Sequence, residues 1–331
     1  MKQTLISVLK LLGLYNNPVV PESVKKNFLS LSEANAAILK TAVIDIFFFG
    51  KEADITRPEN VEDYDAHSYG RLKNFRARHI PFLDAVVQLS GKKILEIGCG
   101  SGCSIVALAE QGATAYGIDV HEPSLSVANL RAKLYGLENK ISTKKCNAAD
   151  VDKEFDADTF DLVIFFASME HMTHQERIAA LKAAWKVTKK DGSVCILGTP
   201  NRLWFFDTHT SQLPFYMWLP DDLAFDYSKF SARHHFNALS QNKYEDMKET
   251  FSRWGRGVSF HEIDLAIKPS AQIKVLADLH SFERSKKFIQ RMLYKRTDEY
   301  KFKKILAAQG PAGINPGFYE YYLDIIMQKD N

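Results

Sequence analysis

The sequence predicts an α/β fold in which helices cover both faces of a mostly parallel β-sheet. Between residues 91 and 200, short β-branched runs alternate with helical patterns, which is typical of parallel strands joined by crossover helices. The first of these runs leads directly into a glycine-rich turn. The chain has 331 residues, 46% hydrophobic and 25% charged, so it can build a large core and has the composition of an ordinary globular protein.

Three regions follow one another along the chain. Residues 1–88 have the pattern of an N-terminal helical segment, and we expect it to cover the active site. Residues 89–200 contain the alternating pattern and form the expected core. Residues 201–331 are less regular, and we expect them to supply an enlarged cap insertion and the last strands of the sheet.

The expected elements follow from the period of the apolar residues. In the core we expect strands over residues 93–97, 113–118, 141–146, 161–166 and 193–197, and helices over 104–110, 125–135 and 175–188. Thr173 and Glu176 form a capping-box pattern at the start of the last helix. In the C-terminal region we expect a helix over 244–254, strands over 258–265 and 318–327, and a basic helical segment over about 276–308.

Composition and spacing exclude several classes of protein. The net charge of +3 does not predict a nucleic-acid partner for the chain as a whole. The four cysteines, at positions 99, 103, 146 and 195, form no CxxC pair. Neither a disulfide scaffold nor a cysteine-rich zinc module is therefore expected, and we interpret the cysteines as small buried residues. His171 and His174 lack a third ligand at metal-site spacing, so no metal centre is predicted.

Two segments have the character of contact surfaces. The first helix, over residues 5–14, is amphipathic and is expected to pack on its own domain or to contact a membrane or partner. Residues 268–304 hold eleven Lys or Arg and four Asp or Glu residues, a local charge of +7. This segment predicts a solvated face, an anionic surface or RNA. No apolar run approaches the roughly 18–20 residues that span a bilayer, so we expect a cytoplasmic protein, peripheral to a membrane at most.

A glycine-rich turn after the first core strand carries the strongest functional signal. Residues 94–102 read Ile-Leu-Glu-Ile-Gly-Cys-Gly-Ser-Gly, a strand that leads through three alternate glycines into a helix. Glycines allow a tight turn, a close approach of the backbone to a ligand, and close packing of the helix on the strand. Asp119 ends the next expected strand, where a carboxylate can accept hydrogen bonds from both ribose hydroxyls of an adenosine. The pattern predicts a nucleoside-containing cofactor at the carboxyl edge of the sheet.

The spacing of the glycines separates two kinds of cofactor. A dinucleotide site has the pattern GxGxxG, which places a pyrophosphate on the N-terminus of the helix. Here the spacing is GxGxG, and Cys103 stands at the position of the third glycine. The carboxylate of Glu96, just before the loop, would repel a pyrophosphate but suits a cofactor that carries an ammonium and a sulfonium. A nicotinamide-dependent oxidoreductase stays the alternative from another enzyme class.

Residues 93–200 resemble the core of class I S-adenosylmethionine-dependent methyltransferases. The resemblance is carried by the glycine motif at 95–102, the acidic second motif at 118–119, the fourth-motif strand at 160–163, the xxEH stretch at 168–171 and the strand end at 198–202. The last of these, Gly-Thr-Pro-Asn-Arg, is similar to the ubiquinone-biosynthesis O-methyltransferase group. The resemblance implies a Rossmann-like sheet of seven strands, and residues 258–265 with 318–327 are the candidates for its final antiparallel hairpin. It also implies S-adenosyl-L-methionine as the cofactor.

The resemblance assigns the glycine loop to the methionine and ribose portions of this cofactor. Gly98, Gly100 and Gly102 would line these portions, together with Glu96 and Cys99 of the same loop. Asp119, by the same resemblance, would take the ribose hydroxyls.

Other cofactor contacts are implied outside the loop. Val120 would pack on the adenine, and Asp150, with Ala149 beside it, is the candidate for contact with the adenine amino group. Phe166 would lie under the methionine end, and Arg71 would pair with the cofactor carboxylate.

The acceptor site is expected above the carboxyl edge of the sheet, between the N-terminal helices and residues 201–230. His209, in an aromatic, proline-containing loop, is the candidate general base, and holding the loop by hydrogen bonds is its alternative role. The resemblance implies O-methylation of a hydroxyl on a small-molecule, sugar or lipid-linked acceptor. Methylation of RNA or of another nitrogen, with the basic segment 268–304 as the contact, is the alternative.

Overall fold

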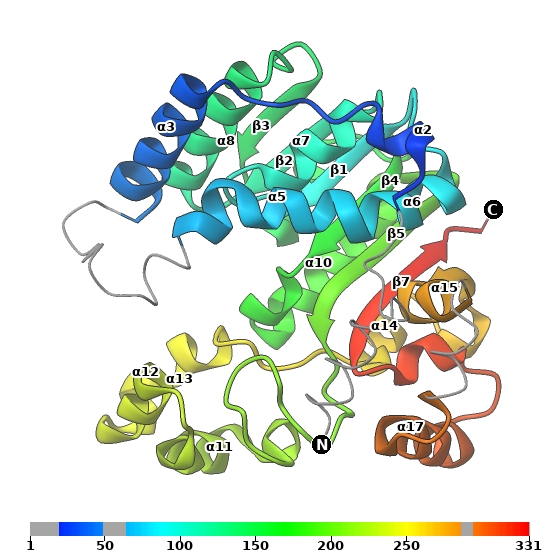
Figure 1. The fold of residues 1–331 in the computed structure, drawn as a ribbon. Helices are drawn as coiled ribbons and strands as arrows, with labels where there is room; N and C mark the ends of the chain where they lie inside the picture. The colour runs from blue at the N-terminus through cyan, green and yellow to red at the C-terminus, as the bar shows by residue number, and fades with distance from the viewer. Residues whose placement is uncertain (1–19, 49–63, 286–293, 331) are drawn as a thin grey trace.

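One β-sheet organises the part of the chain that the structure describes. The structure is a computed structural model and describes residues 20–48, 64–285 and 294–330. In these residues seven strands form a sheet in the order β3-β2-β1-β4-β5-β7-β6 (Figure 1). The predicted helix over residues 5–14 lies outside the described residues, and so do residues 286–293 of the basic segment.

The strands confirm the predicted core of the sheet. They span Lys93–Ile97 (β1), Thr114–Asp119 (β2), Ile141–Lys145 (β3), Phe160–Phe166 (β4), Thr188–Pro200 (β5), Lys274–Asp278 (β6) and Tyr322–Gln328 (β7). Strands β1 to β5 run parallel, and β7 is antiparallel to both of its neighbours. The carboxyl ends of β1, β2, β3 and β4 therefore lie along one edge, where parallel sheets place their ligands.

One predicted strand is wrong. Residues 258–265 do not pair with β7, because most of this stretch is the helix α14 (Phe260–Ala266). Ser259 and Glu262 form a capping box at its start, which satisfies the first N–H groups of a helix. The outer strand of the hairpin is β6, at the start of the stretch predicted as a basic helix, and it pairs with β7 from Lys274↔Gln328 to Asp278↔Ile325.

Helices cover both faces of the sheet, as predicted. One face is covered by α5 (Arg71–Asn74), α6 (Ile80–Val87), α7 (Cys103–Glu110), α8 (Glu122–Leu134) and α15 (Leu279–Ser285), with α2 (Glu22–Lys25) and α3 (Glu33–Ala42) outside them. The other face packs against α9 (Val151–Glu154), α10 (His174–Val187) and α14. Neighbouring strand residues such as Leu162 and Val163 point into opposite layers, as the pleat requires. All four cysteines are buried, as predicted.

Residues 64–87 form a continuous helical run that begins beside the carboxyl edge of the sheet and ends shortly before β1. Two π-helical turns, Ala66–Gly70 and Phe75–His79, interrupt its α-helical hydrogen bonding. Each π-turn inserts an extra residue into the helix and so changes which side chains share a face. The first π-turn and the residue that follows it bring His67 and Arg71 to the same pocket.

A helical cap follows directly after β5. It contains α11 (Asp221–Tyr227), α12 (His234–Asn237) and α13 (Tyr244–Ser252), which lie together below the sheet in Figure 1. A small core of its own, which includes Tyr216, Phe225 and Phe251, holds it together. The last helix, α17 (Asp298–Gln309), lies on the other side of β7 from the cap in Figure 1. In the described residues, no helix is both long and apolar enough to cross a bilayer.

Candidate functional site

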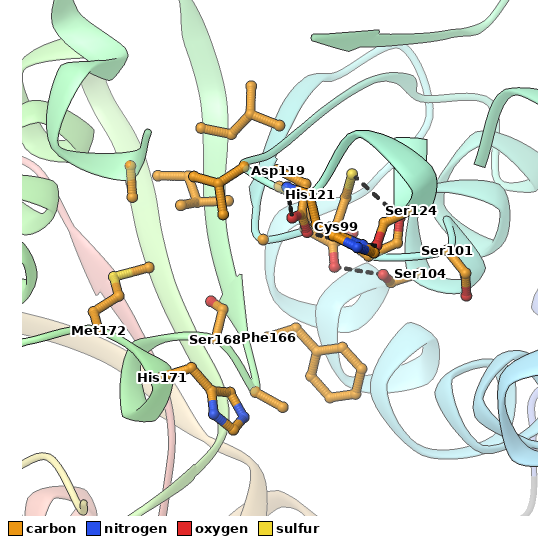
Figure 2. A pocket seen from close by; sticks show the side chains of 18 of the residues that line it. Cys99, Ser101, Ser104, Asp119, His121, Ser124, Phe166, Ser168, His171 and Met172 are labelled. Carbon is orange, nitrogen blue, oxygen red and sulfur yellow. Dashed lines mark hydrogen bonds between the residues drawn. The ribbon is translucent and has the colours of Figure 1, made fainter. Parts of the chain in front are cut away.

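A pocket of about 420 Å³ lies at the carboxyl edge of the sheet, where β1, β2 and β4 end (Figure 2). Its wall comes from residues 96–101, 118–121, 146–148 and 166–168, each of which follows or ends a strand. Figure 2 shows Asp119 at one end of the pocket and His171 at the other. The pocket is therefore at the place where the sequence predicted a nucleoside-containing cofactor.

The three glycines of the loop have different roles. At Gly98, with a φ of +80°, a Cβ atom would lie 2.6 Å from the Cβ of Ser168. At Gly102, with a φ of +82°, it would lie 2.8 Å from the Cβ of Ala128 on α8. Gly100 is different, because a Cβ there would meet no atom within 4 Å. Gly98 and Gly102 thus permit close packing, whereas Gly100 leaves open space against the pocket.

The carboxylate of Asp119 is held in place by backbone N–H groups. Its Oδ2 accepts a hydrogen bond from the Gly100 N–H at 2.9 Å, and its Oδ1 accepts one from the His121 N–H at 2.8 Å. Each carboxylate oxygen has a second lone pair that can accept from a ribose hydroxyl. Val120, next in the chain, is 60% exposed in the same wall and offers an apolar surface for a base.

Glu96 places a carboxyl group with an unpartnered oxygen at the base of the loop. The residue is 1% exposed, its Oε1 accepts a hydrogen bond from the Ser104 hydroxyl, and its Oε2 has no partner among the described residues. Burial raises the pKa of this carboxyl to about 8, against the smaller lowering effect of the Ser104 hydrogen bond. A cation bound in the pocket would supply the missing partner.

The structure brings most, but not all, of the predicted cofactor residues together. Seven of them line the pocket with Asp119, namely Glu96, Gly98, Cys99, Gly100, Val120, Phe166 and Arg71. Gly102, Ala149 and Asp150 are not among the lining residues. Asp150 instead forms an exposed ion pair with Lys153 at 2.6 Å, and the pocket is closed there by Asn147 and Ala148.

Sequence reasoning missed pocket residues that other parts of the chain supply. Phe47 and His67, from the N-terminal segment, line the pocket with their rings 4.4 Å apart. Burial, together with the charges of Arg71 and Arg131, lowers the pKa of His67 to about 3, so its ring is neutral at physiological pH. Arg253 reaches the pocket from the residues after α13. Sequence patterns do not report such contacts, because they depend on how distant segments pack.

A second pocket of about 540 Å³ adjoins the first, and the two share His171 and Arg253. All of its remaining lining residues belong to the cap, namely His209, Thr210, Arg233, Phe236, Thr250, Trp254 and Gly255. His209, the predicted base, thus lies beside the first pocket but in a separate hollow.

A buried carboxylate stands behind His209. The Nε2 of His209 lies 3.9 Å from Oε1 of Glu170, and its Nδ1 lies 3.0 Å from the Thr210 hydroxyl. Glu170 is fully buried, and its other oxygen accepts a hydrogen bond from the Thr199 hydroxyl at 3.3 Å. Burial lowers the pKa of His209, and the Glu170 charge opposes that shift. The arrangement can hold a neutral imidazole and stabilise it once it has taken up a proton.

Comparison with known proteins places the core in a family. Residues 94–192 match the family described as methyltransferase domain. The ubiquinone biosynthesis O-methyltransferase of Hahella chejuensis is 30% identical over 159 residues, which are 46% of this chain and 64% of that protein. Its namesake from Pseudomonas fluorescens SBW25 is 32% identical over 132 residues, 40% of this chain and 54% of that protein.

The family match lies within the predicted core, and each of these relatives covers less than half of this chain. The chain spans about half to two thirds of the length of these relatives. A solved structure of a SAM-dependent methyltransferase from Methanosarcina mazei is 27% identical, covers 35% of this chain and 56% of that one, and has a TM-score of 0.33. Residues 94–192 thus match a methyltransferase domain in sequence, and they supply most of the sheet and of the pocket at its carboxyl edge.

Proposed function

We propose that the protein is an enzyme that transfers the methyl group of S-adenosylmethionine to a hydroxyl group of a small-molecule acceptor. The observation that carries this proposal is the second pocket, where His209 faces the buried Glu170 beside the cofactor pocket. Both relatives are named O-methyltransferases, which supports oxygen as the methylated atom. In this proposal residues 89–200 bind the cofactor, and segments 1–88 and 201–331 enclose the acceptor.

The residues of the first pocket fit the cofactor. Asp119 would accept from the ribose hydroxyls, and Val120 would pack on the adenine. The unpartnered oxygen of Glu96 would face the ammonium or the sulfonium, which suits a cation and opposes the phosphates of a nicotinamide dinucleotide. Arg71 would pair with the cofactor carboxylate, and Phe166 would lie under the methionine end. The loop residues Gly98, Cys99 and Gly100 would also contact the cofactor, since they line the same pocket.

Little covalent chemistry is required of the protein itself. When bound, S-adenosylmethionine supplies an activated methyl group on a sulfonium that leaves as a neutral thioether. The chain must hold the acceptor oxygen in line with the breaking carbon–sulfur bond and exclude water. As the new carbon–oxygen bond forms, the hydroxyl proton passes to Nε2 of His209, whose charge Glu170 would then balance.

The lowered pKa of His209 supports its role as the base. A histidine with a pKa below its ordinary value is neutral near pH 7 and can accept a proton without first losing one. Glu170 does not touch the acceptor in this proposal, so it is a positioning residue. Its carboxylate would hold the ring and favour the protonated form during transfer.

The test is a direct assay of binding and turnover. We expect isothermal titration to show binding of both S-adenosylmethionine and S-adenosylhomocysteine, and a panel of hydroxylated small molecules to release S-adenosylhomocysteine from the donor. His209→Gln should lower kcat by about 10²- to 10⁴-fold, the usual contribution of a general base, with unchanged cofactor affinity. His261→Gln, outside both pockets, is the matched control. Failure of both ligands to bind would refute the proposal.

The basic segment gives less support to a nucleic-acid acceptor than its charge predicts. Arg284 and Lys303 both pair with the buried Glu320. Lys268 pairs with Asp330 and Lys301 with Asp298, so in the described residues four cations of this segment have carboxylate partners. Cations that are already paired release fewer counterions when they meet a phosphate backbone. A small-molecule acceptor is therefore favoured. A lipid-linked acceptor, peripheral contact with an anionic surface and a cytoplasmic location stay predictions.

A further inference from the structure

The second pocket, called the cap pocket from here on, contains two arginines, of which one is paired with carboxylates and the other is not. Arg253 is neutralised, because its guanidinium donates to both oxygens of Glu176 at 2.6 and 2.8 Å and also to Glu249 at 3.1 Å. Arg233 has no carboxylate within ion-pair distance in the described part of the chain. Its Nη1 donates to the backbone carbonyl of His209, which fixes the side chain beside the proposed base.

The donors left on Arg233 suit a carboxylate. Within the described residues, its Nε and Nη2 make no side-chain or backbone contact of hydrogen-bonding length. These two groups form the planar edge of a guanidinium that binds a carboxylate through two parallel hydrogen bonds. An arginine without a counter-ion in a partly enclosed pocket keeps a net positive charge there, and a bound anion would balance it.

The rest of the pocket specifies the body of the ligand. The partly buried Trp254 forms an aromatic wall, and the ring of the buried Phe236 supports it at a centroid distance of 5.7 Å. The volume of about 540 Å³ is in the usual range for a small-molecule site. A planar, apolar body would pack against this wall, with its acidic group toward Arg233 and a hydroxyl toward His209.

We propose that the cap pocket binds an aromatic hydroxy acid, and that Arg233 selects its carboxylate while His209 receives the proton of its hydroxyl. This inference rests on the proposed methyl transfer and names the class of acceptor. Arg233 would act on specificity through binding. It carries no bond-forming step, since the new bond joins the acceptor oxygen to the methyl carbon and the broken bond is the methyl–sulfur bond.

The experiment compares acceptors that differ only in the anionic group. The probes are 4-hydroxybenzoate, its methyl ester, and 4-hydroxyphenyl phosphate as an anion of different shape. We expect wild-type kcat/KM for the acid to exceed that for the ester about ten- to a hundredfold, the range for hydrogen bonds to a charged group. In Arg233→Gln the ratio should fall to near one through loss of activity on the acid alone. Arg233→Lys should restore part of it, and Arg296→Gln, an exposed arginine outside the pocket, should leave it unchanged.

Calorimetric binding of the same probes to the complex with S-adenosylhomocysteine separates the two proposals. Binding of the acid through Arg233 without turnover would support the anion site and count against methylation of that acid. Turnover of the ester at the rate of the acid would overturn the anion site and leave methyl transfer standing. Preference for the phosphate over the acid would overturn the carboxylate assignment. Binding of none of the probes would overturn the inference, whatever the cofactor titration gives.

Discussion

The protonation of Glu96 provides the most direct test of the cofactor pocket. Burial raises the pKa of its carboxyl to about 8, so in the free protein at pH 7 most molecules carry it neutral. A ligand that places an ammonium beside the unpartnered Oε2 favours the carboxylate instead. Binding then releases a proton below pH 8, and the affinity should rise with pH and level off above about 8.

The pKa sets the size of the effect. At pH 6, two units below the pKa, about one molecule in a hundred has the carboxylate, so the apparent Kd should be about a hundredfold weaker than at the high-pH plateau. From pH 6 to 7 the affinity should therefore change nearly tenfold, and from pH 7 to 8 about fivefold, because it approaches the plateau there. If the ammonium can also bind the protonated form, the slope will be smaller but will have the same sign.

S-adenosylhomocysteine is the suitable probe, because it has the ammonium and is chemically stable over this range. Calorimetry in two buffers of different ionisation enthalpy should show release of close to one proton per ligand at pH 6.5. Glu96→Gln should bind with nearly the same Kd at pH 6 and pH 8, whereas the control Asp298→Asn, an exposed carboxylate on α17, should keep the wild-type slope. A wild-type Kd that varies less than twofold from pH 6 to 8, or a slope that persists in Glu96→Gln, would refute the reasoning.

Two further predictions concern the loop and its acid. Asp119→Ala should weaken S-adenosylhomocysteine binding at least about fivefold, because more than about 1 kcal/mol is lost with hydrogen bonds to a charged group. Calorimetry, with circular dichroism as the folding control, will measure the affinity, and an unchanged affinity would contradict the assigned role. Gly102→Ala should lower the free energy of unfolding by about 2 kcal/mol or more, since its Cβ would lie 2.8 Å from that of Ala128. Gly136 also has a positive φ, but a Cβ there would meet open space, so Gly136→Ala should lower the free energy of unfolding less in the same urea titration. An equal loss in the two variants would show that backbone strain, and not the contact with Ala128, acts at Gly102.

The core could be predicted because its signals are local. A strand, a glycine turn and an acid at the end of the next strand are read within about 30 residues, and β1 to β5 follow from the same alternating pattern. At residues 258–265, apolar residues two apart (Val258 and Phe260, then Ile263 and Leu265) predict a strand. Glu262, three residues after Ser259, indicates the start of a helix instead. The structure has the helix, with these two residues as its capping box.

The site was predictable only where one motif contains it. The loop residues and Asp119 lie in one wall, whereas Asp150 was placed by register and lies outside it. Glu170 and His209 are separated along the chain by all of β5, so no spacing rule relates them. Their contact depends on how the cap packs, and the same is true of the distance between Arg233 and His209.

Arg177 explains how the two pockets keep a fixed relation although they belong to different parts of the chain. From α10, its fully buried guanidinium donates to the carbonyls of Met169, Glu170 and Met172 in the loop after β4, and to those of Arg256 and Gly257 at the end of the cap.

Burial lowers the pKa of Arg177 to about 10, which still leaves it charged at physiological pH, and Glu262 lies 3.5 Å away. A lysine has a single nitrogen and could not span these carbonyls. Because in-line transfer tolerates little displacement of the reacting atoms, a rigid cross-link between the loop and the cap is what the proposed chemistry requires. The same contacts hold Glu170 in place, so the cross-link positions the carboxylate behind His209 as well as the pocket walls.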